Sequence, residues 1–506
     1  MPGRQATAPG VLLAILAGVL HGLCFAPAGL WLLAFVAPAP LLLAVRGVTA
    51  GRAAVLGWIA GTVASTIAVT PWMTTALLDY FRQGPAIAIA FATLVGQVFH
   101  ALPTALFALG VRRLERLPSA VARIVCIASL WAALELLRSR LLVGAPWDLL
   151  GHALYAHPLW LQTADLAGVY GVSFACVAIA AALAELPRAP RPALATGVVV
   201  AGLWAGYGAV RLAQERDDGE TVRIALVQGS VPNAWRADPR GADEAFRAFA
   251  DATARVLPER PALIVWSENA ISFLLEPNAR FGGAIASLLG PGGPLLLVGG
   301  PRFAQRQPGR ADFFNSAYLL GADGAVLRTY DKRRLVPFSE YAPFPRIPFL
   351  GWRFDAPGDY TPGHEATVFA KPVPFGVLIC FEAIYPDLAR DLATNGAEVL
   401  LNLSNDAWFG TSAGLEQHFA IAVLRAVEQR RALGRATNTG VTALVGPSGR
   451  ILARFPPGER GAWTVEAPRR RGLTVYGRLG DVFAWLAVLA AAAGLVASAR
   501  RGPAAR

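Results

Sequence analysis

Lysine is nearly absent from this chain. Only Lys332 and Lys371 occur, so 44 of the 46 basic residues are arginines. The net charge of +12 could by itself suggest binding to nucleic acid. However, many of the arginines lie in short stretches between long apolar runs, which is how membrane proteins distribute positive charge. The pattern therefore argues against a nucleic-acid partner and for a membrane.

Cysteine and charged residues are also scarce. Only 16% of the residues are charged and 55% are apolar, which is unusual for a soluble protein. Three of the four cysteines, Cys24, Cys126 and Cys176, lie within apolar runs, with no CxxC spacing and no histidine cluster. This distribution indicates neither a disulfide framework nor a zinc site. We therefore expect no metal and no cofactor, and only Cys380 lies outside the hydrophobic segments.

Eight apolar segments approach or exceed the length needed to cross a bilayer, which is about 20 residues for a helix. The first two are short. The first could pass for a signal peptide, but further spans follow at once, so we interpret it as an anchor. The predicted spans are residues 11–26, 30–45, 53–73, 86–111, 121–143, 166–186, 194–212 and 482–499.

Arginines are distributed unequally between the two ends of these spans. If the N-terminus is cytoplasmic, the other side offers little beyond Arg82 in its short loops. Because positive residues mark the cytoplasmic side, seven crossings place the following segment outside the cytoplasm. We predict a membrane domain (1–213), an outer domain (214–478) and a last span with a cytoplasmic tail (479–506). The arginines assigned to the cytoplasmic side are Arg4, Arg46, Arg52, Arg112, Arg113, Arg116, Arg123, Arg188, Arg191, Arg500, Arg501 and Arg506.

Residues 220–468 show a different pattern. Short apolar stretches alternate with turn signals and with two amphipathic stretches, 242–256 and 416–432. This alternation predicts a mixed α/β domain with buried sheets. The predicted strands are residues 222–227, 262–266, 295–298, 316–320, 326–330, 375–380, 399–402 and 441–445.

The stretch FGVLICF, residues 375–381, is the centre of this domain. Its continuous apolar run predicts a buried strand that ends at Cys380, and a helix is expected over residues 385–395. A thiol between a strand end and a helix N-terminus lies where backbone N–H groups favour the thiolate. The alternative is that Cys380 is a small buried core residue.

Three predicted strands end in groups that can perform acyl chemistry. The strand 262–266 leads to Glu268, the strand 326–330 leads to Lys332, and the third leads to Cys380. A thiolate nucleophile needs a partner that accepts its proton and a positive donor for the oxyanion. Each signal alone also fits a surface charge, and a dyad of Cys380 with His418 is a further alternative.

At these residues the chain resembles the nitrilase superfamily. The shared motifs are WSE ending at Glu268, YDKRRLVPFSEY around Lys332, and CFE beginning at Cys380. The stretches VPFSEYAPF, NLSNDAWFG and RSRLLVGAPW resemble its membrane-embedded branch, the apolipoprotein N-acyltransferases. The resemblance implies an αββα sandwich with a Glu–Lys–Cys triad, inserted before the last of eight membrane spans. It also implies a location in the bacterial inner membrane, with the catalytic domain on the periplasmic side.

Transferred residue by residue, the resemblance implies a reaction in two steps. Glu268 takes the proton of Cys380, and the thiolate attacks a phospholipid ester, by family the sn-1 chain of phosphatidylethanolamine. Lys332 stabilises the oxyanion. The amine of a diacylglyceryl-cysteine apolipoprotein then attacks the resulting thioester. The expected partners are thus a phospholipid donor, an apolipoprotein acceptor and the bilayer, and we expect a monomer.

Further residues receive supporting roles under the same resemblance. Two carboxylates are expected to orient Lys332 and the active-site loop, although a plain structural ion pair is the alternative for both; they are Glu340 and Glu382. Phe381 is a departure, since the family more often has tyrosine there. The residues expected to contact substrate, lipid headgroups or mobile loops near the bilayer are Trp235, Phe338, Tyr341, Phe381, Trp408 and Arg138.

Two other functions compete with acyl transfer to lipoproteins. One is an amidase of the nitrilase type that acts on a small soluble C–N substrate and is merely tethered to the membrane. A tether would need one or two spans rather than eight. The other is a transporter, which should carry paired charges along a path through its spans. The spans carry few charges, most of them near predicted ends, which argues against transport.

Overall fold

The fold is described from a computed structural model covering residues 8–141, 143–215, 219–232, 239–272, 279–307, 310–341 and 360–500. Trp235 lies outside the described residues, as does most of the stretch 338–352, whose aromatic residues and prolines predict a loop at the membrane boundary. The chain divides into two compact units. The first consists of Met1–Glu215, Phe409–Leu424 and Thr474–Arg506, and we call it the helical unit. The second consists of Arg216–Trp408 and Arg425–Leu473, and we call it the sandwich unit.

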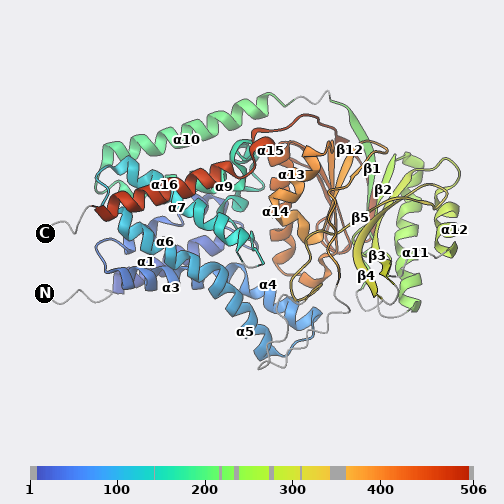
Figure 1. The fold of residues 1–506 in the computed structure, drawn as a ribbon, viewed down its shortest axis with the longest axis horizontal. Coiled ribbons are helices and arrows are strands. Elements are labelled where there is room, and N and C mark those ends of the chain that lie inside the picture. The colour runs from blue at the N-terminus through green and yellow to red at the C-terminus, as the bar shows by residue number, and fades with distance from the viewer. Residues whose placement is uncertain are drawn as a thin grey trace. The chain divides into compact units, whose positions relative to one another are not determined.

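The helical unit is built from apolar helices, and its last helix, α16 (Val482–Arg500), packs against α7 (Ala120–Arg140) and α9 (Ala164–Glu185) (Figure 1). Alanine and glycine at the contacts allow close approach of neighbouring helices. A Cβ atom on Gly61, for example, would lie 2.6 Å from the Cα atom of Ala101. The other elements of this unit are α1 (Ala8–Leu23), η1 (Trp31–Phe35), α2 (Ala39–Ala44), α3 (Ala50–Ala68), α4 (Thr70–Thr75), η2 (Ala76–Tyr80), α5 (Pro85–Gly96), η3 (Gln97–Ala101), α6 (Leu102–Leu114), η4 (Leu150–Leu154), α8 (Pro158–Leu161), α10 (Pro190–Ala213) and α15 (Val475–Leu479).

Every predicted span coincides with helical structure, but the helices differ in length. Within the described part of the chain, five are long and apolar enough to cross a membrane: Pro85–Leu114, Ala120–Arg140, Ala164–Glu185, Pro190–Ala213 and Val482–Arg500. The pair Ala50–Ala68 and Thr70–Tyr80, bent by 54°, makes a sixth if it is counted as one span. The first two predicted spans form shorter helices, Ala8–Leu23 and Trp31–Ala44. Proline explains two of the breaks, because Pro38 and Pro71 cannot continue a preceding helix.

Arginines assigned to one side by the sequence gather around two glutamates. Glu185, at the end of α9, accepts hydrogen bonds from Arg123 at 2.5 and 3.1 Å and from Arg46 at 3.2 Å. Glu115, just after α6, pairs with Arg112 at 3.4 Å and with Arg188 at 3.3 Å. The ends of α6 and α9 and the beginning of α7 therefore share one ionic cluster.

The described residues of the sandwich unit form two six-stranded sheets. The first has the order β12-β1-β2-β3-β4-β5 and the second the order β11-β10-β9-β8-β7-β6. The central pairs β1–β2–β3 and β7–β8–β9 are parallel, and their neighbours are antiparallel. The strands are β1 (Thr221–Gln228), β2 (Leu263–Val265), β3 (Leu295–Gln307), β4 (Arg310–Leu320), β5 (Val326–Asp331), β6 (Val368–Phe369), β7 (Phe375–Ile379), β8 (Val399–Ser404), β9 (Ala432–Thr437), β10 (Ala443–Val445), β11 (Ile451–Arg454) and β12 (Gly461–Pro468).

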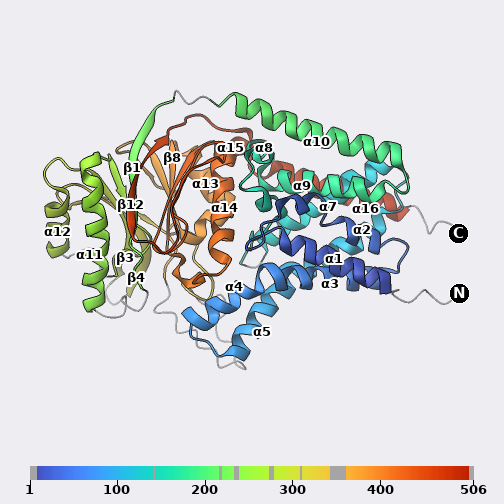
Figure 2. The ribbon, with the colours of Figure 1, turned by 180° about the vertical axis from the view of Figure 1, so that it is seen from behind.

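Helices cover the outer faces of the two sheets. α11 (Pro239–Val256) and α12 (Ala279–Leu289) lie on the first sheet, where Phe249 and Ile285 pack on strand residues such as Ile264 (Figures 1 and 2). α13 (Pro386–Thr394) lies against β7 on the second sheet. The remaining elements are η6 (Leu257–Glu259), η7 (Cys380–Ile384), η8 (Asp406–Phe409) and α14 (Gly414–Gln429), and the last two continue from one unit into the other.

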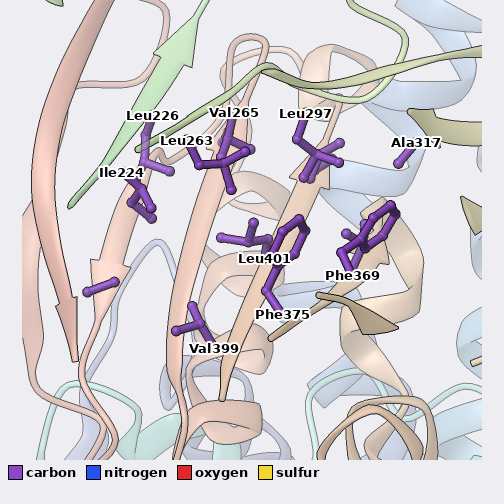
Figure 3. Close-up of a cluster of buried hydrophobic side chains, with 14 of the residues drawn as sticks. Ile224, Leu226, Leu263, Val265, Leu297, Ala317, Phe369, Phe375, Val399 and Leu401 are labelled. Carbon is purple, nitrogen blue, oxygen red and sulfur yellow. The ribbon is translucent and has the colours of Figure 1, made fainter. Parts of the chain in front are cut away.

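The inner faces of the two sheets form one hydrophobic core. Leu226, Val265 and Leu297 of the first sheet face Phe375 and Leu401 of the second (Figure 3). All of these side chains are at most 1% exposed. The order of layers is thus helix, sheet, sheet, helix, as the family resemblance implied, and Cys380 lies at the edge of this core.

Candidate active site

Cys380 directly follows the buried strand β7. The strand pairs in parallel with β8, so its carboxyl end opens at the edge of the second sheet. Cys380 is 3% exposed and has a φ angle of 51°, a left-handed conformation that is rare for a residue with a side chain. Such strain persists where the surrounding structure imposes it, and it is frequent at active sites. The turn η7 then leads into α13, close to the helix expected over residues 385–395.

Lys332 lies between two carboxylates. Its Nζ atom donates hydrogen bonds to Glu268 Oε1 at 3.2 Å and to Glu340 Oε1 at 2.9 Å, and its side chain is 1% exposed. Burial alone would lower the pKa of Lys332, but the negative charges of Glu268 and Glu340 reverse this effect and hold the pKa well above its usual value. The amine is therefore a permanent cation in a dry site.

Asn315 of β4 connects the two carboxylates. Its Nδ2 atom donates to Glu268 Oε1 at 2.8 Å and to Glu340 Oε1 at 2.7 Å. The other oxygen of Glu268 accepts a hydrogen bond from the backbone N–H of Asn405, just after β8, at 2.9 Å. Hydrogen bonds to both of its oxygens thus hold the Glu268 carboxylate in its orientation beside Lys332.

The thiol of Cys380 interacts electrostatically with both groups. Burial raises the pKa of the Cys380 thiol, the charge of Glu268 raises it further, and the charge of Lys332 partly opposes this. The sequence-based expectation that the thiolate is favoured is therefore wrong for the resting site. The physical reason is that the loss of hydration outweighs the nearby positive charge and the helix N-terminus. The sulfur must lose its proton during the reaction, and Glu268 is a carboxylate that can accept it.

Comparisons with known proteins identify the family of this chain. Residues 17–182 match the family described as Apolipoprotein N-acyltransferase N-terminal domain, and residues 223–472 match the Carbon-nitrogen hydrolase family. An apolipoprotein N-acyltransferase from Geobacter metallireducens is 33% identical over 493 residues, which cover 95% of this chain and 94% of that protein. The chain belongs to the apolipoprotein N-acyltransferase family.

A second relative and one solved structure are also similar to parts of this chain. The apolipoprotein N-acyltransferase of Pseudomonas aeruginosa strain PAO1 is 35% identical, with 92% of each chain covered. Among solved structures, an amidase from Nesterenkonia sp. AN1 aligns at 19% identity with a TM-score of 0.37, covering 50% of this chain and 92% of its own.

In this member of the acyltransferase family, Glu382 connects the segments that carry Lys332 and Cys380. Its Oε2 atom accepts from the backbone N–H of Ile379 at 2.7 Å, and its Oε1 atom accepts from the N–H of Arg333 at 2.6 Å. The hydroxyl of Tyr330 lies 2.9 Å from both oxygens. One fully buried carboxylate thus sets the separation of two strand ends.

Replacing Glu382 with glutamine should slow acyl-enzyme formation by about 100-fold, the scale of the loss when reacting groups are misplaced by about 1 Å. The amide nitrogen of glutamine cannot accept, so at least one backbone N–H loses its partner. The rate is measured with labelled phospholipid and the purified chain. Glu398→Gln is the matched control, because Glu398 pairs with Arg469 and Arg471 in the same unit. A Glu382→Gln enzyme as fast as this control would contradict the positioning role.

The structure also places the other predicted residues. Phe338 has a φ angle of 64°, and its N–H donates to Tyr341 O at 2.8 Å, so these two residues shape the turn that carries Glu340. Phe381 packs edge-on against Tyr385 at 5.3 Å. Trp408 is half-buried in the sandwich unit. Their contacts with substrate stay predictions.

Arg138 and His418 both lie in the helical unit. The side chain of Arg138 is only 9% exposed and donates to the backbone oxygens of Phe99 and Trp147, each at 3.1 Å. These contacts hold a loop in place, and a headgroup contact for Arg138 stays a prediction. The ring of His418 packs against Trp147 and Phe409.

A second group of polar residues lies beside Cys380, and the sequence analysis assigned no role to it, although NLSND was among the family motifs. Asp406 and Arg435 form a fully buried ion pair at 2.7 Å, and Ser404 donates to Asp406 at 2.7 Å. Arg435 also donates to Asn402, whose amide donates to Leu378 O at 2.9 Å. This group fixes the backbone beneath the nucleophile. Among the described residues, no cluster of three or more His, Cys, Asp or Glu could hold a metal ion.

Proposed function

We propose that this enzyme transfers an acyl chain from a phospholipid, through a thioester on Cys380, to the N-terminal amine of diacylglyceryl-cysteine apolipoproteins. The arrangement that supports the proposal best is a buried lysine held between Glu268 and Glu340, with the thiol of Cys380 in the field of both Lys332 and Glu268. The family names of the relatives point to the same reaction.

The first half-reaction forms the thioester. Glu268 takes the proton of the Cys380 thiol as the sulfur attacks the ester carbonyl of the phospholipid. The negative charge that develops on the carbonyl oxygen is stabilised by the fixed ammonium of Lys332, which needs no reorganisation at that moment. The C–O bond then breaks, and the leaving lysophospholipid oxygen takes the proton back from Glu268. The acyl group remains on Cys380.

The second half-reaction uses the same groups in the same order. The free amine of the diacylglyceryl-cysteine attacks the thioester carbonyl, and Lys332 again stabilises the oxyanion. Glu268 accepts a proton from the attacking nitrogen, and the C–S bond breaks as the amide forms. The proton returns to the sulfur, which regenerates the thiol. A thioester suits this scheme because an amine attacks it readily.

The proposal includes a location and partners. The donor is the sn-1 chain of phosphatidylethanolamine, and the catalytic domain, residues 214–478, lies on the periplasmic side of the inner membrane. The membrane domain is residues 1–213, and residues 479–506 form the last span and tail of a monomeric enzyme. The grouping of Arg46, Arg112, Arg123 and Arg188 at one end of α6, α7 and α9 supports a cytoplasmic end there.

The alternative, an amidase for a small soluble substrate, has less support. Such an enzyme needs a tether of one or two spans, whereas the described residues include five helices able to cross a membrane. The relatives that match nearly the whole chain are acyltransferases by name.

The two half-reactions can be tested separately with the full chain in nanodiscs. Phosphatidylethanolamine with a labelled sn-1 chain should add one acyl mass to the protein, and hydroxylamine should remove it. A diacylglyceryl dipeptide should then take up the label as an amide. Release of the label only as free fatty acid, with no acylated dipeptide, would contradict the transferase and favour a hydrolase.

A further inference from the structure

The helical unit contains a second polar site that the reaction scheme does not use. It is a pocket of about 120 Å³, formed by the chain after α1, the loop between α7 and α9, and the first half of α14. All of its walls belong to the helical unit. Phe25, Asp148 and His152 are buried in its floor, whereas Pro27 and Gly29 at its rim are exposed, so the pocket opens at that rim.

Asp148 is the most unusual residue of this pocket. It is 2% exposed, yet among the described residues neither carboxylate oxygen has a hydrogen-bond donor. The nearest cations are His100 Nε2 at 3.4 Å and Arg138 Nη1 at 3.7 Å. Arg138 directs its hydrogen bonds to backbone oxygens and to His100 instead. A buried carboxylate without donors costs free energy, unless something else supplies them.

Two neighbouring polar side chains of the pocket are already engaged in other hydrogen bonds. The side-chain amide of Gln417 is fully used, because its Nε2 atom donates to the oxygens of Ala26 and Ala68 and its Oε1 atom accepts from Trp147. The hydroxyl of Tyr155 donates to Glu416. Burial raises the pKa of Asp148 to about 7, because the loss of hydration outweighs the opposing charge of Arg138.

The lining of the pocket restricts the chemistry of a ligand. Two carboxylates, Asp148 and Glu416, and two aromatic rings, Phe25 and Tyr155, line it. Carboxylate oxygens accept hydrogen bonds and aromatic faces attract cations, so the complementary group is a compact cation with several N–H donors. A quaternary ammonium has no N–H and would leave Asp148 without a donor. A primary ammonium fits both requirements.

We propose that this pocket binds the primary ammonium group of a lipid substrate. The proposal rests on the proposed function, because both substrates of that reaction carry such a group. In the donor it is the ethanolamine headgroup, and in the acceptor it is the α-amine of the diacylglyceryl-cysteine. The chemistry of the pocket is the same for both sources, so the experiment has one arm for each.

The test measures binding without turnover, using the full chain with Cys380→Ala in nanodiscs of phosphatidylglycerol. In the donor arm, calorimetry compares lysophosphatidylethanolamine with lysophosphatidylcholine, which lacks N–H donors. In the acceptor arm, it compares a diacylglyceryl dipeptide with its N-acetylated form. We expect at least a tenfold preference for the ammonium ligand in one arm, and that arm identifies the source.

Two variants decide whether the preference arises in this pocket. Asp148→Asn keeps the shape and removes the charge, and Ala153→Leu fills the pocket without changing charge; both should abolish the preference. Asp165→Asn, a buried carboxylate elsewhere in the helical unit, should keep it. No preference in either arm, or a preference that survives both variants, overturns the proposal. Acyl-enzyme formation by the chain with Cys380 intact reports separately on the proposed function.

Discussion

A chain with Cys380→Ala should form no acyl-enzyme when it is incubated with labelled phospholipid. Without the sulfur no thioester can form, and loss of the nucleophile in comparable hydrolases costs on the order of 10⁶ in rate. The measurement is the mass of the intact protein before and after hydroxylamine. The fold should be preserved. Alanine and cysteine both carry a Cβ atom, so the left-handed conformation at residue 380, with a φ angle of 51°, costs both residues a similar free energy.

Two controls make this result specific. Cys24 and Cys176 are buried thiols of the helical unit, so Cys24→Ala and Cys176→Ala should both keep the label. Cys380→Ser tests the nucleophile itself, since its oxygen is a weaker nucleophile and would give an ester that hydroxylamine removes more slowly. A label that survives in the Cys380→Ala chain would show that the acyl group is attached elsewhere.

Replacing Lys332 with methionine should both inactivate and destabilise the enzyme. The change leaves Glu268 and Glu340 buried without the cation between them, and such uncompensated charges cost about 3–5 kcal/mol in the free energy of unfolding. Loss of an oxyanion donor lowers the rate by about 10² to 10³. Chemical unfolding and acyl-enzyme formation measure the two effects on one preparation.

The two effects can be separated by a second substitution. In Lys332→Met with Glu340→Gln, one buried charge is removed, so stability should largely return while acyl transfer stays lost. Lys332→Arg keeps the positive charge, but the guanidinium group is wider than the ammonium group. Because Lys332 is only 1% exposed, the larger group has little room, and we expect low activity. Lys371→Met, which changes the only other lysine, is the matched control. Full activity in Lys332→Arg would contradict the need for a compact ammonium.

The sequence predicted all but one of the inner strands, β9, and missed three of the four edge strands. The parallel strands β7 and β8 are buried on both faces and read as continuous apolar runs, and they were recognised almost to their ends. The strands β6, β9, β11 and β12 were missed. β6 has two residues, and β9 (ALGRAT) contains Arg435, whose charge gave no sign of burial in an ion pair. Pairing partners far away in the chain, rather than local pattern, make these segments strands.

The sequence identified the chemical groups of the site. It did not identify several of the hydrogen bonds between them or the protonation state of the thiol. Glu268, Lys332 and Cys380 follow strand ends in the sequence, and the direct contact of Lys332 with Glu268 is present. The bridge made by Asn315 could not be predicted, because an asparagine in a strand has no local signature of its partner 25 residues away. The state of the thiol was predicted wrongly, because its hydration depends on side chains from many segments.

The sequence alone determined that apolar helices accompany an α/β domain, and which acid, amine and thiol that domain offers, because composition and periodicity are local properties. Only the tertiary structure decided that Lys332 has two carboxylate partners, that Glu382 connects two strand ends, and that Asp148 is buried without a donor. Burial and hydrogen bonding depend on which distant segments meet, and they determine the charge that each of these groups carries.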